Sequence, residues 1–369
     1  MEHIEIQLGE RSYDIHVEGG CLPRLGDFVA GCVGSPPRKV CVATTETVAG
    51  LYLDEAVRAL TNTGYEVVEF VVPDGEEHKT LTTFEAIITK LIEERFERSS
   101  AMIPLGGGVI GDTAGFVAAA YLRGIPFLQV PTTIVAQVDS SIGGKVAVNH
   151  TLGKNLIGCF YQPRGVFVDT RVLTTLEPRE VVSGMGEAVK HALIRDNSFF
   201  AFLEEHVETI MTCEAPDDVM ERFIAWNCRI KADVVRQDER EGGLRAILNY
   251  GHTVGHAVET VTGYTRFRHG EAVILGMIAA GRIAVVKGLI GEDEFGRQNA
   301  LLERIGVRRD LPEITTDDLY EAMTRDKKVS GGRIRFVLPH ATGSVDIHDD
   351  VTREEMDEGM RYMLEYASH

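Results

Sequence analysis

The strongest constraint in this sequence is a change of pattern near residue 177. Before that point, short apolar runs typical of strands alternate with segments of helical spacing, and after it helical patterns follow one another with few strands. Alternation of strands and helices favours a mostly parallel sheet covered by helices. We therefore expect an α/β domain over 1–177 followed by a mostly helical domain over 178–369, with the active site in the cleft between them.

The expected elements follow from hydrophobic periodicity. In the first domain the expected strands are IEIQL (4–8) and YDIHV (13–17) as a hairpin, KVCVAT (39–44), EVVEFVVP (66–73), AMIPL (101–105), PFLQVP (126–131) and GVFVD (165–169), and the expected helices are 47–62, 80–95 and 111–122. In the second domain helices are expected at 178–195, 198–211, 216–236, 245–262, 270–288, 292–305 and 352–366, with one hairpin from RIRFVLP and SVDIH.

Composition excludes several classes of function. The 369 residues are 44% hydrophobic and 25% charged, and their formal net charge of −18 repels nucleic acid, so no polynucleotide partner is expected. The apolar stretch around Ala272–Val286 is interrupted by Arg282 and is too short to span a bilayer, and the acidic amino terminus does not resemble an export signal. Six scattered cysteines without a CxxC pair indicate reduced thiols and a cytoplasmic protein.

A glycine turn follows the strand 101–105. Gly106, Gly108 and Gly111 satisfy GxGxxG before a helix, so backbone amides and the positive helix end can hold the pyrophosphate of a dinucleotide. The alternative is glycines that only permit tight packing, because no acidic residue about 20 positions on offers a ribose contact. The polar loop 74–79 also follows a strand, and it is either part of the ligand-binding sheet edge or a solvated turn.

Three motifs carry candidate metal ligands: GMGEAVKH (184–191), NYGHTVGH (249–256) and RHGEAV (268–273). Glu187, His252 and His269 form the ligand set of a catalytic zinc that keeps one coordination position open. His256 shares a helix face with His252, but the pair lacks the glutamate of HExxH, which argues against a metalloprotease. Taken singly, each histidine also fits a core residue, and Glu187 a surface ion pair. A divalent metal beside a dinucleotide points to oxidation of a secondary alcohol.

An anionic substrate would need a local cationic pocket in so acidic a chain. The basic residues near the motifs that can supply one are Lys145, Lys154, Lys190, Lys231 and Arg245.

Several long strings together identify a family resemblance that covers nearly the whole chain. These are PDGEEHK, GGGVIGDTAGFVAAAYLRG, VPTTIVAQVDSSIGGKVAVNHTLGKNLIG, GMGEAVKHALI, NYGHTVGHAVE and DKKV. They resemble the 3-dehydroquinate synthases, sugar-phosphate cyclases and lyases of the shikimate pathway of aromatic amino acid biosynthesis. The resemblance implies a Rossmann-like NAD-binding domain, a helical metal- and substrate-binding domain, a catalytic zinc or cobalt ion, and a cytoplasmic homodimer.

The resemblance also implies roles for individual residues. The implied metal ligands are Glu187, His252 and His269. The implied NAD-binding residues are Asp74, Gly75, Glu76, Glu77, His78, Lys79, Gly108, Val109, Ile110, Gly111, Asp112, Thr132, Thr133, Lys145, Lys154, Val172, Leu173, Thr174 and Thr175. The implied substrate-binding and catalytic residues are Asp139, Lys145, Asn155, Lys190, Lys231, Arg245, Asn249, His256 and Lys327, with Arg123 reaching across the dimer interface. TTET at 44–47 lacks the Asp or Asn of some relatives, which leaves Thr45 or Thr47 for the adenosine ribose.

The implied reaction converts 3-deoxy-D-arabino-heptulosonate 7-phosphate to 3-dehydroquinate and phosphate. It proceeds by transient oxidation with NAD, phosphate elimination, reduction, ring opening and an intramolecular aldol. Arg245 with Lys231 suits the carboxylate, Lys145, Lys190, Asn155 and Arg123 suit the phosphate, and His256, fixed by Asn249, is the candidate proton relay or a residue that supports the metal ligands.

Two alternatives stay open. One is a metal-dependent polyol or glycerol dehydrogenase that releases NADH, and the other is a sugar-phosphate cyclase with a carboxylate-free substrate. Arg245 and Lys231 disfavour both, because a substrate without a carboxylate would leave these charges unpaired.

Overall fold

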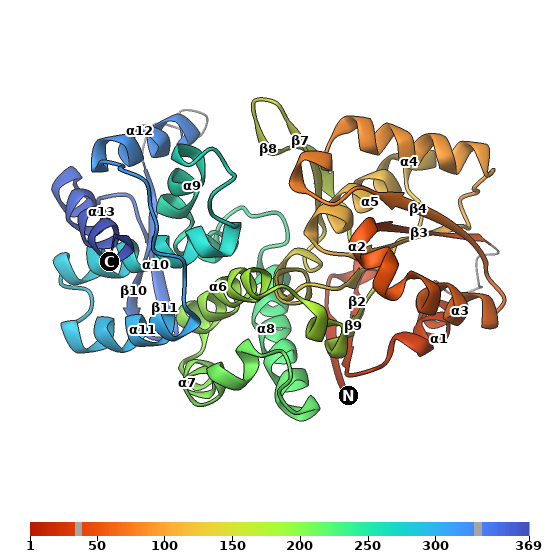
Figure 1. The fold of residues 1–369 in the computed structure, drawn as a ribbon, viewed down its shortest axis with the longest axis horizontal. Coiled ribbons are helices and arrows are strands. Elements are labelled where there is room, and N and C mark those ends of the chain that lie inside the picture. The colour runs from red at the N-terminus through yellow and green to blue at the C-terminus, as the bar shows by residue number, and fades with distance from the viewer. Residues whose placement is uncertain (34–38, 328–333, 369) are drawn as a thin grey trace. The chain divides into compact units, whose positions relative to one another are not determined.

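The computed structural model describes residues 1–33, 39–327 and 334–368, and the chain divides into two compact units (Figure 1). The α/β unit comprises Met1–Leu176 and Ala215–Arg240, and the helical unit comprises Glu177–Glu214 and Glu241–His369. The predicted division assigned all residues after 177 to the helical domain, whereas Ala215–Arg240 belongs to the α/β unit. Its helix α8 (Asp217–Gln237) packs against β1 (Glu2–Ile6), β2 (Tyr13–Glu18) and the helical turn η6 (Ala136–Ser140), so it belongs to the α/β unit.

A parallel sheet forms the centre of the α/β unit. Among the described residues its strand order is β4 (Glu66–Val72), β3 (Lys39–Thr45), β5 (Ala101–Gly106), β6 (Val130–Pro131), and every pairing is parallel. All residues of β5 are buried, as expected for a central strand covered on both faces. Helices α1 (Leu25–Cys32) and α3 (Asp54–Asn62) supply one hydrophobic core, and α4 (Leu81–Glu93) and α5 (Gly108–Ala120) supply another.

The other strands of the α/β unit form two smaller sheets. β2 pairs antiparallel with β1 and parallel with β9 (Gly165–Asp169). A hairpin of β7 (Lys145–His150) and β8 (Gly153–Phe160) was not among the predicted elements, because β8 lacks buried, alternating apolar residues. The strand predicted at 126–131 is shorter than expected. Only β6 (Val130–Pro131) pairs continuously, Phe127 and Gln129 form isolated bridges, and Pro126 lacks a backbone donor.

The second unit is mostly helical, which together with the parallel sheet confirms the predicted fold class. Its elements are α6 (Pro178–Arg195), α7 (Asn197–Met211), α9 (His252–Val261), α10 (His269–Val286), α11 (Glu292–Ile305), α12 (Thr316–Lys327), β10 (Phe336–Ala341), β11 (Ser344–His348) and α13 (Arg353–Ala367). Helix α10 lies at the centre and contacts α6, α9, α11, α13 and β10 (Figure 1). Within the described residues it alone is long and apolar enough to cross a membrane, whereas the sequence predicted a stretch too short to do so. However, 78% of this helix is buried inside the protein.

The helix predicted over 245–262 is divided into two. A short helix η8 (Leu244–Asn249) ends before Gly251, whose φ of 78° lies in the left-handed region that glycine adopts without steric cost. Helix α9 therefore begins at His252, and this residue occupies its first turn.

Candidate active site

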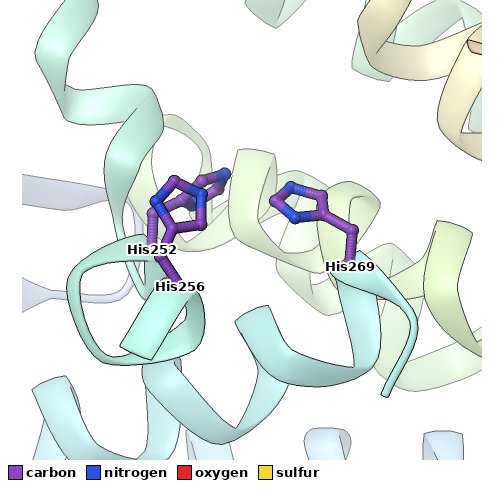
Figure 2. A group of neighbouring side chains, drawn as sticks. All are labelled: His252, His256 and His269. Atoms are coloured by element: carbon purple, nitrogen blue, oxygen red, sulfur yellow. The ribbon is translucent and has the colours of Figure 1, made fainter. Parts of the chain in front are cut away.

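Glu187, His252 and His269 meet inside the helical unit. Glu187 lies on α6 and is fully buried, and its Oε1 is 3.6 Å from Nε2 of His252 and 3.5 Å from Nε2 of His269. Figure 2 shows the imidazoles of α9 and α10 pointing toward one another, and the rings of His252 and His269 are 5.1 Å apart between centroids. Three segments that are distant in the sequence thus bring their side chains to one point.

The Nδ1 atoms of His252 and His269, which point away from Glu187, each have a hydrogen-bond acceptor. Nδ1 of His252 lies 3.1 Å from the backbone oxygen of Tyr250, and Nδ1 of His269 lies 3.1 Å from Oε2 of Glu259. In a neutral imidazole these contacts require a proton on Nδ1, so the lone pair on Nε2 faces the carboxylate of Glu187. Two lone pairs and a carboxylate oxygen around one point fit a divalent metal such as zinc.

His256 belongs to the same cluster. One ring nitrogen from each of His252, His256 and His269 lies within 4.8 Å of the other two, and the ring centroid of His256 is 5.3 Å and 5.7 Å from those of His252 and His269. The donor set is therefore one carboxylate and three imidazoles, from which a metal site with an open position can be built.

The environment perturbs the two candidate ligands in opposite directions. Burial lowers the pKa of His252 to about 3, so this ring is neutral and able to bind a metal. Burial also opposes protonation of His269, but hydrogen bonds with Glu187 and Glu259 outweigh it and raise its pKa to about 10. A metal at this position competes with the proton of His269.

Two glycines of α10 let the ligand-bearing helices touch. A Cβ on Gly270 would lie 1.7 Å from the backbone oxygen of Ser183, and a Cβ on Gly276 would lie 1.8 Å from that of Gly251. The first contact joins α10 to α6, and the second joins α10 to the start of α9. Close approach at these two glycines brings together the helices that carry Glu187 and the histidines.

A buried carboxylate fixes the start of α10. Oε2 of Glu271 accepts a hydrogen bond of 2.8 Å from the backbone N–H of Arg268, and Arg179 of α6 donates to both its oxygens at 3.0 and 2.6 Å. Glu271 and Arg179 were not predicted as site residues. The sequence feature that could have identified Glu271 is its position three residues after Arg268, where a glutamate caps the helix that begins at His269.

Two of the predicted cations of the helical unit are buried. Lys190 is 1% exposed and donates to Oε2 of Glu187, and Arg245 in η8 is also 1% exposed. Asn249 is exposed at the end of η8, and His256 is half-buried. Lys327 ends α12, but its side chain and residues 328–329 of the DKKV string lie outside the described part of the chain.

Lys231 and Asp139 form an ion pair within the α/β unit. Nζ of Lys231 donates to Oδ1 of Asp139 at 2.6 Å and to its backbone oxygen at 2.5 Å, and Lys231 is 5% exposed. Two residues predicted for the substrate pocket are therefore in direct contact, one from α8 and one from η6.

The loop at 74–79 joins a polar network rather than forming a separate surface turn. Nζ of Lys79 donates to Oδ2 of Asp112 and to Oδ1 of Asn155, both at 2.6 Å. Burial raises the pKa of Asp112, although its ion pair with Lys79 opposes this shift. Asn149, which sequence reasoning missed, donates to Glu76 at 2.8 Å and accepts from the backbone of Asn155 at 2.8 Å. The sequence feature that could have identified Asn149 is its position at the start of the NHTLGKN turn.

At the carboxyl end of β4, Asp74 accepts from the backbone N–H and the hydroxyl of Thr47 at 3.0 and 2.7 Å. Thr47, one of the two threonines left for the adenosine ribose, is thus joined to the loop at 74–79.

The glycine turn connects β5 to α5 as predicted. A Cβ on Gly111 would lie 2.9 Å from Gln129, which is a packing role, and Gly108 opens the helix, where its contact with a dinucleotide stays a prediction. Thr133 lies against Gly107, and Thr132 is bonded to Gly106 through its backbone at 3.0 Å. These residues and the first amides of α5 form the edge that can face a pyrophosphate.

The remaining predicted residues lie at other edges of the α/β unit. The segment 172–175 is held by Tyr52, whose hydroxyl contacts the backbone oxygen of Val172 at 3.0 Å and Thr175 at 2.7 Å. Lys145 is exposed at the start of β7, Lys154 is half-buried in β8, and Arg123 is exposed with a φ of 69°.

Two family models match consecutive segments of the chain. Residues 69–183 match the model described as 3-dehydroquinate synthase N-terminal, and residues 184–329 match 3-dehydroquinate synthase C-terminal. A 3-dehydroquinate synthase from Desulforamulus reducens is 44% identical over 359 residues, which cover 96% of this chain and 98% of the relative.

Solved structures are similar over the same length. The 2-epi-5-epi-valiolone synthase ValA from Streptomyces hygroscopicus subsp. jinggangensis 5008, with NAD+ and Zn2+ bound, gives a TM-score of 0.89 at 25% identity, covering 98% of this chain and 99% of the other. A 2-deoxy-scyllo-inosose synthase complexed with carbaglucose-6-phosphate, NAD+ and Co2+ gives a TM-score of 0.87 at 29% identity, with the same coverage.

Proposed function

Because the chain belongs to the 3-dehydroquinate synthase family, we propose that it converts 3-deoxy-D-arabino-heptulosonate 7-phosphate to 3-dehydroquinate and inorganic phosphate. The observation that carries this proposal is the convergence of Glu187, His252 and His269 beside the buried Lys190. Identity of 44% to a synthase of this name, against 25% and 29% for the valiolone and inosose synthases, favours the carboxylate-bearing substrate.

Glu187, His252 and His269 are proposed to hold a zinc or cobalt ion, and NAD is proposed to bind along the glycine turn and the loop at 74–79. When bound, the metal polarises the hydroxyl to be oxidised, and NAD supplies reversible hydride transfer without net redox change. The two cyclase structures that contain NAD+ with Zn2+ or Co2+ support this pair of cofactors. Glu187 is fully buried, so water has little access to this proposed ligand.

The side chains of this chain bind the two anionic groups of the substrate. The guanidinium of Arg245, with Lys231, is proposed to hold the carboxylate through paired hydrogen bonds, and the contact with Asp139 keeps the ammonium of Lys231 in place. Lys190, Lys145 and Asn155 are proposed to hold the phosphate, and Lys327 to complete the pocket. These residues orient the substrate and stabilise its charge, which is the main contribution expected of the protein.

A proton must move at the oxygen that is oxidised and later reduced. His256 is proposed as the relay, because its ring stands beside those of His252 and His269 without being needed as a third imidazole ligand. Asn249, at the end of the preceding helix η8, is proposed to orient it.

We propose a homodimer in which Arg123 reaches the substrate phosphate of the partner subunit. Arg123 is exposed, and the neighbouring Leu122 is 40% exposed. The β7–β8 hairpin also exposes Leu152 and Leu156, at 86% and 66%, which supports an interface on the α/β unit. The six cysteines, all in the described part of the chain, are free thiols, in keeping with the cytoplasm as the proposed location.

The test follows phosphate and NADH together in one reaction. Purified protein with the heptulosonate phosphate, catalytic NAD and zinc is expected to release one phosphate per substrate without lasting absorbance of NADH. A chelator should abolish the reaction, and zinc or cobalt should restore it.

Stoichiometric NADH would contradict the proposal and support a polyol dehydrogenase. Turnover of a carboxylate-free sugar phosphate in preference to the heptulosonate would instead support another cyclase.

A further inference from the structure

Glu259 is a buried carboxylate behind one of the candidate ligands, and it has no assigned role. We propose that Glu259 is a positioning residue that fixes the tautomer and orientation of His269 and thereby sets the metal affinity of the site. This inference rests on the metal centre of the proposed function.

The first support is position. Glu259 follows His252 and His256 on α9 at seven and three residues, so the three share one face of that helix. Oε2 of Glu259 lies 3.1 Å from Nδ1 of His269, and the residue is 3% exposed. One helix therefore supplies a metal ligand and also orients the ligand of the next helix.

The second support is the contrast between the two imidazoles. His252 is oriented by a neutral acceptor, the backbone oxygen of Tyr250, whereas His269 is oriented by a full negative charge. A charge-assisted hydrogen bond in a buried site is stronger than a neutral one. A carboxylate at Nδ1 also makes Nε2 a better donor to a metal. Of these two imidazoles, His269 is thus the one whose strength as a ligand depends on another side chain.

The third support is the anchoring of Glu259 itself. Its backbone oxygen accepts a hydrogen bond of 2.8 Å from Tyr264 and one of 3.3 Å from the hydroxyl of Thr262. These residues begin the connection from α9 to α10, which ends at His269. The backbone that carries the carboxylate is therefore fixed at the start of the short connection that ends at the imidazole.

The experiment measures metal affinity directly, by competition of the protein with a chromophoric chelator for zinc. Glu259→Ala is expected to weaken zinc binding about 10- to 100-fold. Glu259→Gln keeps an oxygen acceptor without the charge, so its loss should be smaller. The visible spectrum of the cobalt-substituted protein should change in Glu259→Ala, because an unrestrained imidazole alters the geometry at the metal.

Glu294→Gln is the matched control. Its carboxylate lies on α11 and accepts from Thr342, away from the imidazoles, so zinc affinity and the cobalt spectrum should equal those of the wild type. Circular dichroism of each metal-free variant establishes that it is folded.

A folded Glu259→Ala variant with wild-type zinc affinity and cobalt spectrum would overturn the inference. Turnover of the heptulosonate phosphate by the wild type is measured separately. A wild type that binds zinc through His252 but releases no phosphate would refute the proposed function alone, and zinc affinity that His252→Ala leaves unchanged would refute both.

Discussion

At the scale of single residues, the chemistry depends on buried charges in an acidic chain. Three lysines are buried among the side chains that the structure describes, and each contacts a carboxylate. The pairs are Lys79 with Asp112, Lys190 with Glu187, and Lys231 with Asp139. Burial of ion pairs costs desolvation and is weak evidence for stability, so their concentration at the predicted site residues indicates function.

Arg245 is the residue whose replacement most directly tests substrate choice. Arg245→Ala is expected to lower kcat/KM about 10- to 100-fold for the heptulosonate phosphate, because hydrogen bonds between charged groups are worth about 1.5–3 kcal/mol. An analogue with the carboxylate replaced by hydroxymethyl should lose much less. Steady-state phosphate release with both substrates gives the comparison.

Arg245→Lys is the control, since it keeps the charge but not the planar pair of donors, and it should fall between wild type and Arg245→Ala. Equal losses for both substrates would contradict the assignment of Arg245 to the carboxylate.

At the scale of elements, the site depends on how closely three helices approach. Helix α10 touches α6 at Gly270 and α9 at Gly276, and both contacts are between backbones. Side chains at these positions would separate the helices that carry Glu187 and the histidines. The glycines therefore act on the metal site through packing.

Gly270→Ala is expected to destabilise the protein by about 1–3 kcal/mol and to weaken zinc binding, because the new Cβ would lie 1.7 Å from the backbone oxygen of Ser183. Thermal unfolding and zinc titration measure the two effects. Gly296→Ala on α11 is the matched control: a Cβ there meets nothing within 4 Å, so stability should be unchanged or rise by up to about 1 kcal/mol. Wild-type zinc binding in a Gly270→Ala protein would show that this contact does not position the ligands.

At the scale of the whole molecule, the compact units do not follow the order of the chain. Helix α8 follows α6 and α7 of the helical unit in the sequence, but it packs against β1, β2 and η6 of the α/β unit. Lys231 is therefore a residue of the α/β unit, and Arg245, only fourteen positions later, belongs to the helical unit.

The proposed homodimer has a test that does not depend on stability. Arg123→Ala and Glu187→Ala are each expected to abolish most activity. Coexpressed with different affinity tags, the two variants should form mixed dimers that regain activity, because one site then has an intact Glu187 and an Arg123 from the partner. Mixed dimers as inactive as either parent would place the action of Arg123 within its own subunit.

Local sequence determined the fold class, most element positions and the candidate ligands, because periodicity and motif strings are properties of neighbouring residues. KVCVAT and AMIPL became central parallel strands, and Glu187, His252 and His269, predicted from three separate motifs, lie together in the structure. The break at Gly251 was not predicted, since a single glycine in a helical pattern is usually tolerated.

Only the tertiary structure decided which residues support the ligands and where α8 belongs. Glu259 behind His269, Arg179 on Glu271 and Asn149 in the Lys79 network all depend on contacts between distant segments, which have no local pattern. The hydrophobic stripe of α8 required a partner but did not specify which one, because burial of apolar surface is non-directional. Specific hydrogen bonds and close backbone contacts made that choice once the chain was folded.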